Sequence, residues 1–380
     1  METTHVFIVD SNTFKYHLEY MFAGTGSANK VIDFNNSSTS SLHYASENSL
    51  LGMIADIQRI RIGDNIIFYL QQNNSEDIKE GKFFGMFKVK NRIGFLDNND
   101  ANQYLKQELN KSLTFRIVIE ANDVYPIGVT EWEALDEIKN IQSPNQMIWS
   151  LIYRKLKGNR GNTMITIYES DRLKQLIRNK NNRISINGNN FTFNINTQQI
   201  ETLDIQNYYN GRQEDINILP RLINKYSNNL QFETHLQAYI LQNLENINIF
   251  QNESIEWIGN EVSCGVGMQR IDIMLSSLRG NDKVCIPIEL KSTIAYLGIT
   301  NQVQRYIDWI EQYYIPNRPS DIEPIILSRK IDDKTTQFYL DLVNEFNDFN
   351  NRNNILQLKY IEFDVDCNNS IIDFIEIDYI

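Results

Sequence analysis

The sequence of 380 residues contains only three cysteines and four histidines. The cysteines, Cys264, Cys285 and Cys367, are far apart and fit neither a disulfide framework nor the spacing of a zinc site. We therefore expect a reduced, cytoplasmic setting. No run of about 18 apolar residues occurs, which argues against a membrane-spanning helix. Residues 1–9 lack the basic start of a signal peptide and resemble a strand.

The remaining composition, 42% hydrophobic and 22% charged, is that of an ordinary soluble globular protein. The length suggests two domains. We expect an α/β (α+β) chain with one domain at 1–200, a linker at 201–216 and a second domain at 217–380. The net charge of -12 argues against a protein that coats nucleic acid along its whole surface.

Two strand-like stretches, 270–275 and 284–292, carry charges among apolar residues. Asp272 lies on the first stretch, and Glu289 and Lys291 share one face of the second because side chains alternate along a strand. Charged groups are rarely buried without a partner or a metal. This pattern predicts a divalent metal held by Asp272 and Glu289, with Lys291 beside it. The common alternative is a solvated face of an antiparallel sheet.

The neighbouring segments strengthen the metal-site hypothesis. Residues 232–244 have the apolar spacing of a helix, with Glu233 in the first turn. A second helix is expected at 302–310, where Gln302 and Tyr306 lie four residues apart on one face. A short buried strand at 324–328 follows. Pro287 inside the second charged strand suggests a bulge or a local edge there.

Asp272, then Glu289-Leu290-Lys291, then Gln302-x-x-x-Tyr306 together resemble the PD-(D/E)XK nuclease superfamily. The Gln-x-x-x-Tyr helix is similar to its RecB-like branch, and the whole run resembles the NucS-like branch. The resemblance covers about residues 228–330, roughly a quarter of the chain. It implies a nuclease domain with a mixed central sheet flanked by helices.

The resemblance also implies roles for individual residues. Mg²⁺, for which Mn²⁺ can substitute, would be held by Asp272, Glu289, the backbone oxygen of Leu290 and Glu233. Lys291 would orient or deprotonate a water and offset charge on the phosphate. Gln302 and Tyr306 would orient Lys291 and a phosphate of the cleaved strand. The catalytic set is therefore Asp272, Glu289, Lys291, Gln302 and Tyr306. Glu261 is interpreted as a surface ion-pair partner.

Two stretches near the N-terminus, 62–70 and 81–89, each combine glycine with a strand-like apolar run. They resemble PUA-like mixed β-barrels of the EVE and YTH type. The resemblance implies a recognition domain, because some members hold a flipped, modified base in an aromatic pocket. The candidate pocket residues share an aromatic ring, and a place in the hydrophobic core is the commoner alternative for each: Phe14, Tyr16, Phe34 and Tyr44.

Residues 151–185 carry nine basic and two acidic residues, a net charge of +7 in an acidic chain. Lysine and arginine neutralise phosphates, and glycines let the backbone approach them closely. The segment therefore predicts DNA contact, with a solvated helix face at 170–182 as the alternative. The predicted DNA-binding residues are Arg154, Lys155, Lys157, Arg160, Arg172 and Lys174.

These observations favour a Mg²⁺-dependent endonuclease that cuts double-stranded DNA in a restriction or defence system. Its N-terminal domain would choose the site or the base modification. A homodimer is expected, because two nuclease sites are the simplest way to cut both strands of a symmetric site. We expect no nucleotide cofactor and no membrane partner. A NucS-like repair nuclease acting on mismatched or branched DNA is one alternative. A non-catalytic nucleic-acid reader is the other, and the intact acidic residues and lysine argue against it.

Overall fold

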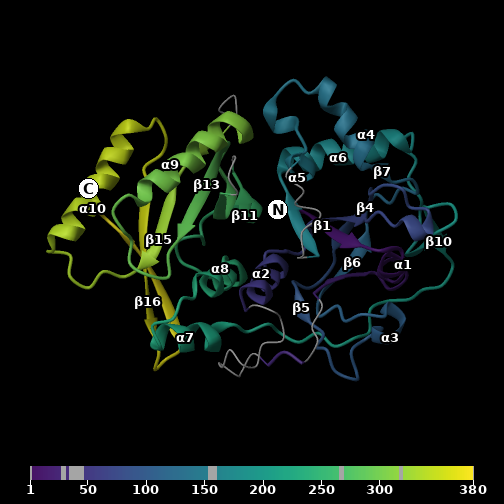
Figure 1. Ribbon diagram of the computed structural model, residues 1–380, viewed down its shortest axis with the longest axis horizontal. Coiled ribbons are helices and arrows are strands. Elements are labelled where there is room, and N and C mark those ends of the chain that lie inside the picture. The colour runs from purple at the N-terminus through teal and green to yellow at the C-terminus, as the bar shows by residue number, and fades with distance from the viewer. Residues whose placement is uncertain are drawn as a thin grey trace. The chain divides into compact units, whose positions relative to one another are not determined.

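The structure is a computed structural model that describes residues 2–26, 31–33, 47–152, 161–264, 269–315 and 320–379. It is a mixed α/β structure (Figure 1). The described chain divides into two compact units at Ile216 and Asn217. Each unit has its own sheet and is described here by itself.

Unit 1 contains a curled, half-barrel sheet with the strand order β2-β6-β4-β3-β1-β8, in which β5 also pairs with β6 and β7 with β4. The strands β1 and β3 are parallel and the other pairs are antiparallel. The strands are β1 (Thr4–Val9), β2 (Phe22–Thr25), β3 (Asn65–Leu70), β4 (Lys82–Val89), β5 (Phe95–Leu96), β6 (Phe115–Ala121), β7 (Val129–Thr130) and β8 (Asn162–Ile165).

The helices of unit 1 are α1 (Ser11–Tyr20), α2 (Glu47–Gln58), α3 (Lys106–Leu109), α4 (Glu131–Asp136), α5 (Trp149–Ile152) and α6 (Ile167–Lys180). A separate hairpin of β9 (Asn190–Asn194) and β10 (Gln199–Leu203) follows them. Successive side chains of β3 face two different parts of the core. Phe68 packs toward α1, whereas Ile67 and Tyr69 lie in a cluster with residues of α6.

The two described aromatic residues proposed for a base pocket have different environments. Phe14 is fully buried, and its ring lies 5.3 Å from that of Phe68 and 5.2 Å from that of Phe84. Phe14 is therefore a core residue. Tyr16 is partly exposed and stacks near Tyr20, with ring centroids 6.3 Å apart. Phe34 and Tyr44 lie outside the described residues.

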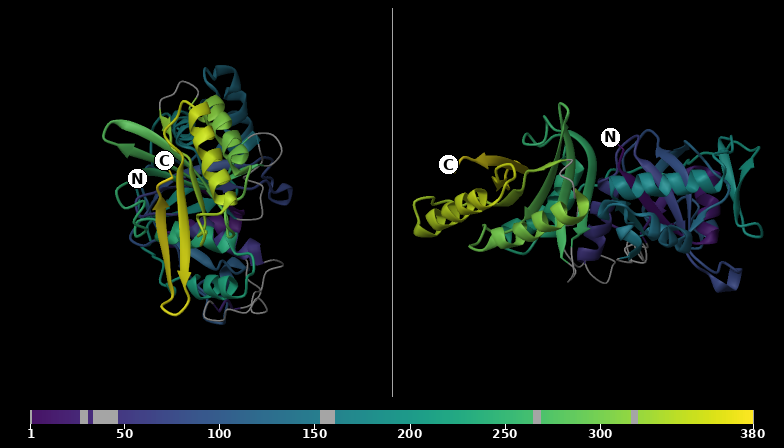
Figure 2. Two further views of the ribbon diagram at one scale, coloured as in Figure 1. Left: turned by 90° about the vertical axis from the view of Figure 1, so that its left-hand side faces the viewer. Right: turned by 90° about the horizontal axis from the view of Figure 1, so that it is seen from above.

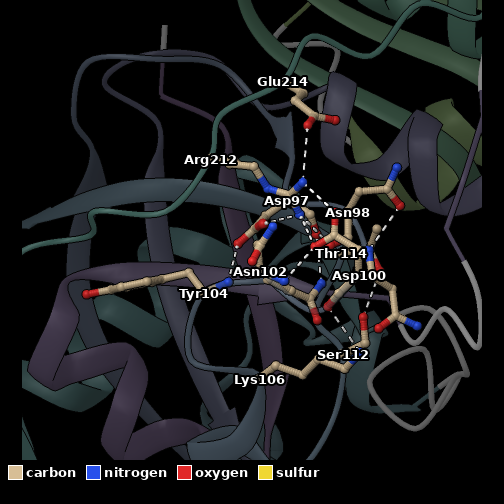
Figure 3. Close-up of polar contacts among 12 residues, drawn as sticks. Asp97, Asn98, Asp100, Asn102, Tyr104, Lys106, Ser112, Thr114, Arg212 and Glu214 are labelled. Atoms are coloured by element: carbon tan, nitrogen blue, oxygen red, sulfur yellow. Dashed lines mark hydrogen bonds and ion pairs between the residues drawn. The ribbon is translucent and has the colours of Figure 1, made fainter.

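The stretch expected as a linker, 201–216, belongs to unit 1, and its first three residues are the end of β10. Further along, Arg212 and Glu214 contact other residues of unit 1 (Figure 3). Leu96 and Glu214 exchange two backbone hydrogen bonds of 2.9 Å. Arg212 Nη1 donates to Asp100 Oδ2 at 2.6 Å. The Tyr209 hydroxyl donates to the buried carboxylate of Asp97 at 2.9 Å. A composition rich in Asn, Gln and Gly predicts an irregular backbone, which is compatible with this packing, but it does not reveal these anchoring contacts.

Unit 2 contains a mixed sheet with the order β11-β12-β13-β15-β16-β17, and β14 pairs with β13. Parallel pairing joins β15 to β13 and to β16, and β14 to β13, whereas the outer pairs are antiparallel. The strands are β11 (Ser254–Ser263), β12 (Arg270–Arg279), β13 (Asp282–Leu290), β14 (Asp321–Ile322), β15 (Ile325–Arg329), β16 (Lys359–Asp366) and β17 (Ile371–Ile377).

Helices cover both faces of this sheet (Figures 1 and 2). On β16, Phe363 meets Phe232 at the start of α8, whereas Tyr360 meets Phe346 of α10. These two strand residues face opposite sides because their positions differ by an odd number. The helices are α7 (Leu219–Ser227), α8 (Glu233–Asn243), α9 (Ile299–Trp309), which continues into a π-helical turn at Ile310–Tyr314, and α10 (Gln337–Arg352). Within the described ranges, no helix combines the length and apolarity needed to cross a membrane.

Candidate active site

The predicted acidic residues meet where β12 begins and β13 ends. The antiparallel register pairs Ile273 with Ile288, so Asp272 and Glu289 come next to each other one step further on. The backbone N–H of Leu290 donates to Asp272 Oδ2 at 2.8 Å, which fixes the orientation of that carboxylate. Glu289 is almost completely buried. The charged pattern therefore does not lie on a solvated face.

Pro287 lies where the neighbour of β13 changes. On one side of β13, the pairing with β12 continues without a register shift, and Pro287 is the partner of Met274. On the other side of β13, the pairing with β14 ends at Cys285 and the pairing with β15 starts at Ile288. The missing N–H of proline thus falls at a local edge, one of the two arrangements expected from the sequence. The change of partner brings β15 beside Glu289.

Helix α9 supplies a pair of side chains that orient Glu289. The Tyr306 hydroxyl lies 2.6 Å from Glu289 Oε2 and 2.9 Å from the carbonyl oxygen of Arg270, and both oxygens are acceptors. Gln302 Nε2 donates to the same hydroxyl at 2.7 Å. The sequence suggested that this pair orients Lys291, whereas its contacts run to the neighbouring carboxylate.

Lys291 lies among oxygen atoms. Its ammonium donates to Glu289 Oε1 and, at 3.0 Å, to the carbonyl oxygen of Leu290. Glu233 Oε2 on α8 lies 3.9 Å away. Burial alone would lower the pKa of Lys291, but the charges of Glu289, Glu233 and Asp272 outweigh it and raise that pKa. The ammonium therefore stays protonated at neutral pH.

The acidic groups outnumber the cation. Burial raises the pKa of Asp272 well above its ordinary value, and the charges of Glu289 and Glu233 add to this effect. Burial also raises the pKa of Glu233, against the opposing influence of Lys291. Three carboxyl groups thus share one ammonium. Such a desolvated negative site favours an additional positive charge.

The donor atoms fit a magnesium ion. Among the described residues, no group of three or more His, Cys, Asp and Glu side chains is arranged to hold a metal. Mg²⁺, however, prefers oxygen ligands and is commonly held by one or two carboxylates with retained waters. Asp272, Glu289 and the Leu290 carbonyl offer that chemistry, and the last two already contact the ammonium of Lys291.

Sequence reasoning missed Gln237. Its side chain is buried, and Nε2 donates to the carbonyl oxygen of Asp272 at 2.7 Å. Gln237 lies four residues after Glu233, so both side chains share one face of α8. That spacing was the available signal. Helix α8 therefore contributes a contact to the backbone of β12 as well as a carboxylate beside Lys291.

The predicted basic surface is only partly described. Arg154, Lys155, Lys157 and Arg160 lie outside the described residues. Arg172 pairs with Glu137 at 2.8 Å. Burial lowers the pKa of Lys174, which also lies near the charge of Asp171.

The other cations near the end of α6 also have acidic partners. Arg178 pairs with Asp123 at 2.7 Å and Lys180 with Glu133 at 2.5 Å. The described part of this helix thus has much of its charge neutralised by residues 123–137. A count of charges within 151–185 alone could not reveal these partners. Glu261 pairs with Arg270, as expected of a surface ion-pair residue.

No protein-family model matches the chain, and no curated protein matches its sequence. The functional argument therefore rests on the contacts of the site.

Proposed function

We propose that the protein is a Mg²⁺-dependent endonuclease that hydrolyses phosphodiester bonds in double-stranded DNA as part of a restriction or defence system. In this proposal, unit 2 is a PD-(D/E)XK nuclease domain and unit 1 is a PUA-like recognition domain. The observation that carries it is the meeting of Asp272, Glu289 and Lys291 at the adjacent ends of β12 and β13.

In this proposal, different side chains bind the metal ion, orient Glu289 and contact the phosphate. Asp272, Glu289, Glu233 and the Leu290 carbonyl would hold the ion. Bound Mg²⁺ would supply a more acidic water and neutralise charge on the phosphate. The Tyr306 hydroxyl holds Glu289 in one orientation. The raised pKa of Lys291 favours a role as a cation and hydrogen-bond donor toward water or a phosphate oxygen over that of a base.

The test removes one carboxylate charge at a time. Asp272→Asn and Glu289→Gln should each lower cleavage of plasmid DNA in Mg²⁺ by more than about 100-fold, because a metal ligand is lost. DNA affinity should change little. Glu376→Gln, at an exposed position of β17, is the matched control and should cleave like the parent. Normal cleavage by either site variant would contradict the active-site assignment.

The choice of DNA substrates tests the biological role. The parent should be assayed on plasmid and phage DNA with and without methylated cytosine or adenine, and on mismatched and branched duplexes. Discrete fragments from the unbranched DNAs are expected of a restriction enzyme. Cleavage confined to mismatched or branched duplexes would replace the defence role with a repair role.

A further inference from the structure

The loop between β13 and α9 exposes three large apolar side chains within four positions. Ile294, Tyr296 and Leu297, called the apolar triad here, are 43%, 44% and 48% exposed. A single exposed apolar residue is ordinary on a protein surface. A cluster of them beside a polar site is typical of a binding surface.

The backbone of this loop is held at several points. Arg329 N donates to the Thr293 carbonyl at 3.0 Å, and Ala295 is fully buried. Gly298 N donates to Glu345 Oε2 at 2.7 Å, and Gly298 has φ of +93°. These contacts present the apolar triad to solvent on an ordered backbone. Its exposure is therefore not the fraying of a loose loop.

A series of hydrogen bonds joins the apolar triad to the acidic site. The Tyr296 hydroxyl lies 3.4 Å from Gln302 Oε1. Gln302 Nε2 donates to Tyr306, whose hydroxyl contacts Glu289. A ligand that packs on Tyr296 would therefore lie beside the side chains that orient the catalytic carboxylate.

A cation lies on the same side of α9. Arg305 is three residues after Gln302, so the two are neighbours on the helix surface. Its side chain is exposed and, within the described part of the chain, forms no ion pair. Exposed aromatic rings beside free cations suit a nucleic-acid strand, because bases stack on the ring and phosphates attract the cation.

We propose that the apolar triad contacts a base of the strand being cut, with Tyr296 stacked on that base and Arg305 near the adjoining phosphate. The proposal rests on the proposed nuclease function for the identity of the ligand. A base can reach the ring only when it leaves the duplex stack. The contact therefore favours single-stranded or locally unstacked DNA over fully paired duplex.

The test measures binding without cleavage. Fluorescein-labelled DNA, as a single strand and as the same sequence in duplex form, is titrated with the full chain in EDTA and followed by anisotropy. Tyr296→Ala should weaken single-strand binding about 5- to 100-fold, with a smaller effect on duplex. Tyr296→Phe keeps the ring and should stay within about twofold of the parent. Ile375→Ala, at a position of β17 that is 52% exposed, is the control for loss of an exposed apolar side chain and should bind like the parent.

The outcomes separate this inference from the proposed function. Parent-like binding by Tyr296→Ala, or an equal loss in Tyr296→Phe or Ile375→Ala, overturns the base contact. If the parent binds no DNA, the base contact is also overturned. Cleavage in Mg²⁺ or Mn²⁺ is measured in parallel and decides the nuclease function alone. Binding that depends on the Tyr296 ring, without any cleavage by the parent, would leave the base contact standing and reject the nuclease.

Discussion

His17 differs from the polar residues of the candidate site because its ring is buried without a hydrogen-bond partner among the described residues. It lies on α1 of unit 1, is almost fully buried, and both ring nitrogens lack hydrogen-bond partners among the described residues. Its ring packs edge-on against Phe22, with centroids 4.8 Å apart. Burial, together with the charge of Arg116, lowers the pKa of His17 from 6.5 to about 3. The folded chain therefore keeps this imidazole neutral across mildly acidic pH.

This lowered pKa predicts a pH dependence of stability. Between pH 6.5 and about 3, His17 binds a proton in the unfolded chain but not in the folded chain. The contribution of the neutral His17 ring to the free energy of unfolding is thus complete above pH 6.5, and it is lost as the pH falls from 6.5 towards about 3. The loss amounts to about 1.4 kcal/mol per pH unit at most. His17→Leu should remove this component, so urea unfolding should show the variant gaining stability relative to the parent on acidification. A difference between the two that stays constant from pH 7 to 4 would contradict the assignment.

At the scale of elements, α9 depends on α10 for its first turn. Gly298, the N-cap of α9, has no side chain with which to cap the helix. Glu345 of α10 accepts hydrogen bonds from Gly298 N at 2.7 Å and from Thr300 N at 3.1 Å. A carboxylate at a helix N-terminus satisfies free N–H groups and complements the helix dipole. The contact between the two helices thus sets the start of the helix that carries Gln302 and Tyr306.

Removing this cap should affect both stability and cleavage. Glu345→Ala should lower the free energy of unfolding by about 1–2 kcal/mol, as loss of an N-cap does. It should also slow cleavage, because the first turn of α9 positions Gln302. Urea denaturation and plasmid cleavage are the measurements. Asp341→Ala, at an exposed site one turn earlier on α10, is the matched control and should change little. Unchanged stability in Glu345→Ala would show that the capping contact does not hold α9.

At the scale of the whole molecule, the proposed double-strand cut favours an arrangement with two active sites. The described chain contains one constellation built from Asp272, Glu289 and Lys291. One site cuts one strand at a time, so a double-strand cut at a symmetric sequence is simplest with a two-fold pair of chains. The proposal of a homodimer follows from this argument and from the proposed function.

The expected stoichiometry is two chains per symmetric duplex. The Asp272→Asn variant should allow the complex to be studied without cleavage. Sedimentation velocity with a duplex that the parent cuts should give a complex with the mass of two chains and one DNA. A complex of one chain per duplex, at protein concentrations well above the dissociation constant, would contradict the homodimer.

Several elements could be predicted from the sequence because their signals are local. Strand-like apolar runs predicted β12 and β13, and helical spacing predicted α8 and α9, to within a few residues. The motif spacing singled out Asp272, Glu289 and Lys291, which the structure brings together. Alternation and helical periodicity depend only on neighbouring residues, so they can be recognised without knowing the fold.

Contacts between distant residues depended on the tertiary structure. Tyr306 could be placed on a helix from the sequence, but its partner Glu289 depends on how α9 packs on β13. The same holds for Gln237 and the carbonyl of Asp272. Periodicity specifies which face of an element is buried, but it does not specify which residue of another element meets that face.

The sequence by itself determined the chemistry of the charged residues, and the tertiary structure decided which charges are neutralised. Local charge alone predicts that Arg172 contacts DNA, and the structure shows in addition that it pairs with Glu137, 35 positions earlier. Arg212 was assigned to a linker, yet it pairs with Asp100, 112 positions earlier. Coulomb attraction depends on distance in space, and only the packing of the chain brings such partners within a few ångströms of each other.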